Sequence, residues 1–163
     1  MPAQVMDGTS VAESLIGVTE SVAAAFEART GRKPCLATVL VGDDPASHTY
    51  VRMKRNRCAR VGIESRNIEL PPDTSTAGLV AEISLLSDDP TVDGILLQHA
   101  TPPQIDERAA FEAITPAKDV DGVTMHSFAA MSFGEKGFHS CTPGASSDCS
   151  TPTTSTSAGH TPS

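Results

Sequence analysis

The sequence predicts an α/β fold, a three-layer α/β/α domain built on a short parallel sheet. Apolar runs of strand length occur at 35–41 and 94–97, and a third strand is expected at 64–70. A segment with helical periodicity precedes the first strand, and another follows each of the three. This alternation predicts parallel strands covered by helices on both faces.

The first predicted helix extends from Ser10, as its cap, to about Arg29, and Gly31 ends it. Five side chains at helical spacing form its expected apolar face: Val11, Leu15, Val18, Val22 and Phe26. After the strand at 35–41, the turn GDDP leads into a helix from Ala46 to near Gly62. Helices at 76–86 and 106–114 follow the other two strands.

Composition limits the classes of function. The chain has 163 residues and 39% hydrophobic content, which fits one domain with a core. Its net charge of −8 argues against a nucleic-acid or anionic-membrane partner. We find no apolar run of membrane-spanning length and no signal-peptide pattern at the N-terminus, so we expect a cytoplasmic protein.

The cysteines are scattered, without the CxxC spacing of a zinc site or a disulfide framework: Cys35, Cys58, Cys141 and Cys149. We therefore expect reduced thiols and no bound metal.

Polar residues follow the predicted strands at their carboxyl ends, where parallel sheets bind ligands. In the helix after the first strand, Ser47, Tyr50 and Lys54 lie at i, i+3 and i+7 and share one face. Gln98 ends the strand at 94–97, and Asp119 to Asp121 lie in the loop PAKDVDG. Lys54 alone would be typical of a solvated surface, since arginines surround it. The two later segments turn it into a candidate functional residue.

Three motifs carry a resemblance to a known family: VGDDPASHTYVRMKRNRCARVGI at 41–63, DGILLQHATPP at 93–103 and PAKDVDGVTMHSFAAMSFGEKGFHSCTPG at 116–144. In this order and spacing, they resemble the N-terminal catalytic domain of the methylenetetrahydrofolate dehydrogenase/methenyltetrahydrofolate cyclohydrolase family. The resemblance covers about residues 10 to 144, so we expect a folate-binding catalytic domain at 1–144.

The resemblance implies a role for each site residue. Lys54 would be the catalytic general acid/base, and Gln98 would hold its amine. Tyr50 would stack on the folate ring system, Asp121 would accept hydrogen bonds from the pterin, and Ser47 would belong to the substrate site. These roles suit the chemistry, because a carboxylate only accepts hydrogen bonds and desolvation can bring the pKa of a lysine toward neutrality.

Two residues near the candidate site residues in sequence, Asp119 and His99, receive lesser roles. We expect Asp119 to shape its loop rather than contact ligand. His99 follows Gln98 where the commoner family pattern is a Leu-Pro-Leu-Pro run, and we expect a solvated side chain there.

The segment 145–163 departs from the family. Ser or Thr fills 11 of its 19 positions, so it cannot bury enough apolar surface to offset the cost of ordering and is expected to be a disordered tail. A second hypothesis is that the tail is family sequence translated out of frame, because shifted codons can spell IIRLLDAYDVDLSG. The coding DNA tests this hypothesis directly.

The family's activity is oxidation of 5,10-methylenetetrahydrofolate with NADP, followed by hydrolysis to 10-formyltetrahydrofolate. No G-x-G-x-x-G pattern follows a strand here, so we expect a truncated member that lacks the dehydrogenase step. The alternatives are a non-catalytic folate-binding or interaction module and an inert fragment. Family members form homodimers largely through the cofactor domain, so we do not carry the dimer over. We expect an exposed apolar patch and self-association instead.

Overall fold

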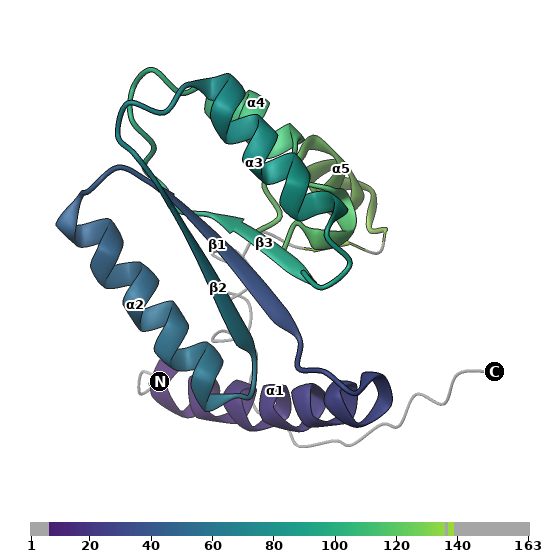
Figure 1. Ribbon diagram of the computed structural model, residues 1–163. Coiled ribbons are helices and arrows are strands. Elements are labelled where there is room, and N and C mark those ends of the chain that lie inside the picture. The colour runs from purple at the N-terminus through teal and green to yellow at the C-terminus, as the bar shows by residue number, and fades with distance from the viewer. Residues whose placement is uncertain (1–6, 136, 139–163) are drawn as a thin grey trace, which may run out of the picture.

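The computed structural model describes residues 7–135, 137 and 138. The predicted tail at 145–163 and the domain boundary at 144 lie outside these residues. The elements in chain order are α1 (Gly8–Thr30), β1 (Cys35–Val41), α2 (Pro45–Arg60), β2 (Glu64–Leu70), α3 (Thr76–Asp88), β3 (Gly94–Leu97), α4 (Glu107–Glu112), the 3-10 turn η1 (Pro116–Lys118) and α5 (Met125–Phe133) (Figure 1). The predicted strands have these bounds, α4 is shorter than predicted, and η1 and α5 are additions to the predicted order.

The strands form a parallel sheet of order β2-β1-β3. β1 pairs with β2 from Cys35 opposite Glu64 onward and with β3 from Leu36 opposite Gly94 onward. One bridge widens the sheet, because Ile95 of β3 also pairs in parallel with Asp119. All these segments therefore point their carboxyl ends to the same edge, as the sequence predicted.

Helices cover both faces of the sheet (Figure 1). α2 packs on β1 and β2, whereas α3 packs on β3 and on α4. The main core lies on the α3 side, and its buried members are Ala37, Val39, Val41, Leu79, Ile83, Leu86, Val92, Ile95, Leu97, Ile105, Ala110, Phe111 and Ile114. Burying a side chain such as Leu79 stabilises the fold by about 2 kcal/mol. The α/β/α fold class is confirmed.

α1 begins at a different cap from the predicted one. The carboxylate of Asp7, and not the hydroxyl of Ser10, accepts hydrogen bonds from the N–H groups of Thr9 and Ser10 at 3.1 and 3.3 Å. A carboxylate at this position adds a favourable charge at the positive end of the helix. Gly31 ends α1 with a φ of 75°, as predicted.

The predicted apolar face of α1 is not the face that packs. Leu15, Val18 and Val22 are 50%, 60% and 63% exposed, whereas Ala23 is buried. Helix periodicity identifies apolar stripes on a helix, but it does not say which stripe packs against the rest of the domain. In α1 the stripe that packs is the neighbouring one, which contains Ala23. None of the helices within the described part of the chain is both long and apolar enough to cross a membrane.

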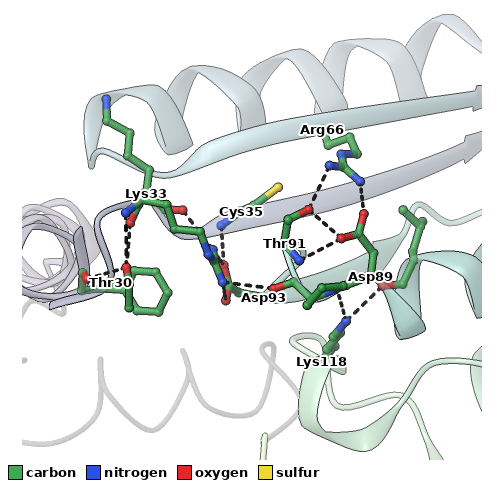
Figure 2. A network of polar contacts seen from close by, with 12 residues as sticks. Thr30, Lys33, Cys35, Arg66, Asp89, Thr91, Asp93 and Lys118 are labelled. Atoms are coloured by element: carbon green, nitrogen blue, oxygen red, sulfur yellow. Dashed lines mark hydrogen bonds and ion pairs between the residues drawn. The ribbon is translucent and has the colours of Figure 1, made fainter. Parts of the chain in front are cut away.

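A polar network fixes the amino ends of the strands (Figure 2). Arg32 donates to both oxygens of Asp93 at 2.6 and 2.8 Å, and Asp93 also accepts from the Cys35 N–H at 2.8 Å. Arg66 of β2 pairs with Asp89 at 2.7 Å. The network ties the turn before β3 to β1 and β2. It lies at the edge of the sheet opposite to the predicted site.

Candidate functional site

The turn between β1 and α2 forms the first side of the candidate site. Gly42 has a φ of 94°, a left-handed conformation that favours glycine, and its N–H donates to the Leu70 carbonyl at 2.9 Å. The Asp44 carboxylate then caps α2 by accepting from the Ser47 N–H at 2.8 Å. Pro45 occupies the start of the helix, where its missing N–H costs nothing. These local features start α2 at the carboxyl edge of the sheet.

Lys54 and Gln98 meet across 44 residues of sequence. Nζ of Lys54 donates to Oε1 of Gln98 at 3.0 Å. Gln98 is 9% exposed, and its backbone N–H donates to the Val39 carbonyl at 2.8 Å, which extends the β1–β3 ladder by one step. Its Nε2 donates to the His99 carbonyl at 2.6 Å, so the amide oxygen remains directed at Lys54. The half-buried Lys54 is therefore held in place by Gln98, which directly follows β3.

Tyr50 lies one helical turn before Lys54 on the same face of α2. Tyr50 is 59% exposed. An exposed aromatic ring beside a lysine is available to stack on a flat heteroaromatic ligand.

Ser47 is turned toward the helix cap. It is 6% exposed, and its hydroxyl donates to Oδ2 of Asp44 at 2.9 Å. The backbone and side-chain hydrogen bonds from Ser47 hold the pKa of Asp44 below its usual value. Ser47 thus stabilises the first turn of α2, and its contact with substrate stays a prediction.

Asp119 organises the loop between η1 and α5. It is fully buried and accepts hydrogen bonds from the N–H groups of Val123 at 3.1 Å and Thr124 at 2.9 Å, and from the Ser127 hydroxyl at 2.6 Å. Burial raises the pKa of this carboxyl, but the hydrogen bonds outweigh burial and the net pKa is lowered. The Asp119 carboxylate is engaged in hydrogen bonds that shape its own loop, in agreement with the sequence-based expectation.

Asp121 lies at the corner of a tight turn, in which the Gly122 N–H donates to the Asp119 carbonyl at 3.3 Å. This turn directly follows the parallel bridge between Ile95 and Asp119. The chain leaves that bridge in the direction of the strands, so the turn lies toward the edge where Gln98 ends β3. Asp121 is half-buried.

His99 is exposed, as predicted, and its ring also contacts two residues of α4. Its Nδ1 lies 3.4 Å from Oε1 of Glu107, and its ring centroid lies 4.9 Å from that of Phe111. Glu107 also accepts from the N–H and hydroxyl of Thr101 at 3.2 and 2.9 Å. Burial raises the pKa of Glu107, but these contacts outweigh it and lower the net pKa. Glu107 fixes the loop after Gln98, and the only sequence signal for it is its place in the first turn of α4.

The residues of the turn after β1 can be compared with those that a dinucleotide such as NADP requires. A dinucleotide site places the pyrophosphate at the N-terminus of the helix after the first strand, on a glycine-rich turn. Here Asp43 and the capping Asp44 bring negative charge to that position, and Gly42 is the one glycine of the turn. The residues of this turn do not fit NADP. Among residues 7–135, 137 and 138, we find no cluster of three His, Cys, Asp or Glu that could hold a metal ion.

Comparisons with known proteins agree with this geometry. Residues 6–121 match the family described as "Tetrahydrofolate dehydrogenase/cyclohydrolase, catalytic domain". The bifunctional protein FolD 1 of Streptomyces avermitilis is 68% identical over 142 residues, which are 87% of this chain and 50% of that protein. FolD 1 of Salinispora arenicola is 61% identical over 89% of this chain and 52% of its own length. The chain therefore spans about half the length of the curated relatives it matches.

Solved structures share the fold. The bifunctional FolD of Campylobacter jejuni superposes with a TM-score of 0.85 and 33% identity, over 90% of this chain and 52% of its own. The Trypanosoma brucei FolD, solved with NADP cofactor and an inhibitor, gives a TM-score of 0.74 and 34% identity, over 80% and 45% of the two chains. Because the family match extends from the N-terminal segment to the loop that carries Asp121, the chain belongs to the tetrahydrofolate dehydrogenase/cyclohydrolase family, within its catalytic domain.

Proposed function

We propose that the chain binds a one-carbon derivative of tetrahydrofolate and hydrolyses 5,10-methenyltetrahydrofolate to 10-formyltetrahydrofolate. The observation that carries this proposal is the 3.0 Å hydrogen bond between Lys54 and Gln98 at the carboxyl edge of the sheet. It gives a lysine amine one defined direction, which a general acid/base requires.

The chemistry needs two proton transfers at neighbouring atoms. Water attacks the methenyl carbon and loses a proton, which the neutral amine of Lys54 accepts. The bond from that carbon to N5 of the folate then breaks, and the resulting ammonium of Lys54 donates a proton to N5. The second water proton leaves to solvent, so that the formyl group remains on N10. Gln98 orients the amine in both steps without exchanging a proton.

Two further residues would bind the folate. The exposed ring of Tyr50 would stack on the planar part of the ligand, one helical turn from the lysine. The Asp121 carboxylate would accept hydrogen bonds from the amino and ring N–H groups of the pterin, which present several donors on one edge. Ser47 would act on the substrate through the first turn of α2.

The longer members of the family are bifunctional dehydrogenases and cyclohydrolases, and NADP supplies the hydride acceptor for oxidation of methylenetetrahydrofolate. We assign no hydride-transfer role to residues of this chain, because the turn after β1 does not fit NADP. Hydride transfer also depends on holding the cofactor against the folate.

A second candidate is a folate-binding module without turnover. The observation that favours it is the openness of the site, since Tyr50, one helical turn from Lys54, is 59% exposed. An open site admits bulk water, which weakens electrostatic interactions with a charged intermediate.

Loss of methenyltetrahydrofolate, followed by its absorbance and corrected for the uncatalysed rate, distinguishes the two candidates. We expect Lys54→Met to lower the catalysed rate by about a hundredfold or more. Calorimetric titration with the same ligand should show that the variant still binds. Arg57→Met, which removes an exposed cation from the same helix, is the matched control and should retain the rate.

Equal rates in the wild type and Lys54→Met would contradict catalysis by Lys54. Ligand binding without any catalysed rate in the wild type would support the binding module.

A further inference from the structure

Two motifs of the sequence touch where the loop that carries Asp121 runs alongside β3. A Cβ atom added at Gly94 would lie 2.5 Å from Cγ1 of Val120, closer than real side chains approach. The same atom would lie 3.4 Å from Cδ1 of Leu36, an ordinary contact. Gly94 is buried, and Val120 therefore packs on its bare backbone. Close approach of this kind is one reason for glycine within a strand.

The segment on either side of Val120 is fixed. Before it, the Lys118 ammonium donates to three carbonyls at the end of α3, those of Leu86 at 3.1 Å, Ser87 at 2.7 Å and Asp89 at 2.7 Å (Figure 2). A cation suits the negative end of a helix. After it, the chain is held by the hydrogen bonds that the buried Asp119 accepts from Val123 and Thr124. The Lys118 bonds and the parallel bridge between Ile95 and Asp119 join the loop to the rest of the domain, so the loop cannot move away from β3 as a whole without breaking them.

Val120 directly precedes Asp121 in the tight turn. Its β-branched side chain has few favoured rotamers, so a crowded contact is relieved by the backbone more readily than by the side chain. With Lys118 and Asp119 anchored, that movement falls on the turn containing Asp121.

We propose that Gly94 is a positioning residue for Asp121. The missing side chain at Gly94 lets Val120 seat on β3, and this contact holds the Asp121 carboxylate at the edge where Gln98 ends the strand. The inference rests on the proposed folate-binding role of Asp121. It links the DGILLQ and KDVDG motifs through one steric fit.

A size-complementation experiment tests this fit with the full chain. Gly94→Ala crowds the contact, Val120→Ala removes Cγ1, and the double variant restores space, because the added atom would then lie 3.7 Å from the Cβ of residue 120. We expect Gly94→Ala to bind 5,10-methenyltetrahydrofolate about tenfold or more weakly, by calorimetry. The double variant should bind within about threefold of Val120→Ala. Gly17→Ala, with open space around its added Cβ, is the matched control.

The backbone amide resonances of Asp121 and Gly122 provide a readout that does not need ligand. They should shift in Gly94→Ala and return in the double variant toward their positions in Val120→Ala. Unshifted resonances in Gly94→Ala, or no recovery in the double variant, would overturn the inference. If the resonances shift and recover while no variant, nor the wild type, binds the folate, the positioning role stands and the proposed function fails.

Discussion

Gln98 determines the direction of the Lys54 amine because its side-chain amide is held at both ends. Its nitrogen donates to the His99 carbonyl at 2.6 Å, and its oxygen accepts from Lys54 at 3.0 Å. A neutral acceptor orients the amine without placing a negative charge beside it. This neutrality suits a lysine that must take up and return a proton at neutral pH.

Gln98→Glu should therefore change the pH dependence of hydrolysis. A carboxylate about 3 Å from the amine favours the ammonium form, so less neutral amine is available to accept a proton from water. We expect a lower rate at pH 7 and a pH–rate profile displaced to the alkaline side. Gln98→Leu, which removes the acceptor without adding charge, should lower the rate with no alkaline displacement. A profile for Gln98→Glu that coincides with the wild-type profile would contradict this account.

Asp119 is the residue whose loss should destabilise the fold most clearly around the site. In Asp119→Asn, the amide nitrogen must face one of three donors, the N–H groups of Val123 and Thr124 or the Ser127 hydroxyl. We expect a loss of about 2 kcal/mol in the free energy of unfolding at pH 7, measured with urea. Asp88→Asn, an exposed change, is the control.

The sign of the pH dependence follows from the lowered pKa of Asp119. A carboxyl whose pKa is lower when folded adds stability above its unfolded pKa and loses it as the pH falls through the folded pKa. The difference in the free energy of unfolding between the wild type and Asp119→Asn should therefore become smaller below about pH 4. An equal difference at pH 7 and pH 3 would show that the stability comes from something other than the charge.

At the scale of elements, α1 has an apolar face without a partner among the described residues. Leu15, Val18 and Val22 lie at i, i+3 and i+7 and are each at least half exposed. Elsewhere α1 is tied to α2 by the ion pair between Glu13 and Arg60 at 2.7 Å. Because this pair is exposed, it contributes little to holding the helix in place.

We expect the chain to self-associate through this face of α1. Val18→Glu places a charge in the middle of the stripe and should shift the sedimentation profile toward the monomer, since burying an unpaired carboxylate is costly. Ala24→Glu, exposed on another side of the same helix, is the control and should leave the profile unchanged. A wild-type profile that is already monomeric across the concentration range would contradict the prediction.

At the scale of the whole molecule, the sheet separates structural support from the proposed chemistry. The ion pairs of Arg32 and Arg66 gather at the amino ends of the strands (Figure 2), whereas Lys54 and Gln98 meet at the carboxyl ends. Lys118 directly precedes the loop that carries Asp121, and its ammonium donates to the carbonyl of Asp89 in the network.

Much of this arrangement could be predicted from the sequence. The strands and the fold class follow from periodicity and turn residues, which are properties of neighbouring positions, and the roles of the candidate residues follow from the resemblance of three motifs to the family. The cap at Asp7 and the packing face of α1 could not be predicted. Capping residues compete within a few positions, and two apolar stripes of one helix have the same period.

The sequence by itself determined the family, the order of strands and helices from α1 to α4, and the identity of Lys54, Gln98, Tyr50 and Asp121 as candidates. The resemblance implied that Gln98 holds the Lys54 amine. Only the tertiary structure decided the geometry of that hydrogen bond, the engagement of Ser47 in a helix cap, and the packing of Val120 on Gly94. Those contacts join residues on different elements or depend on side-chain rotamers. They arise from the register of β3 and the path of the crossover helices, because distances between elements are set by packing and not by local preference.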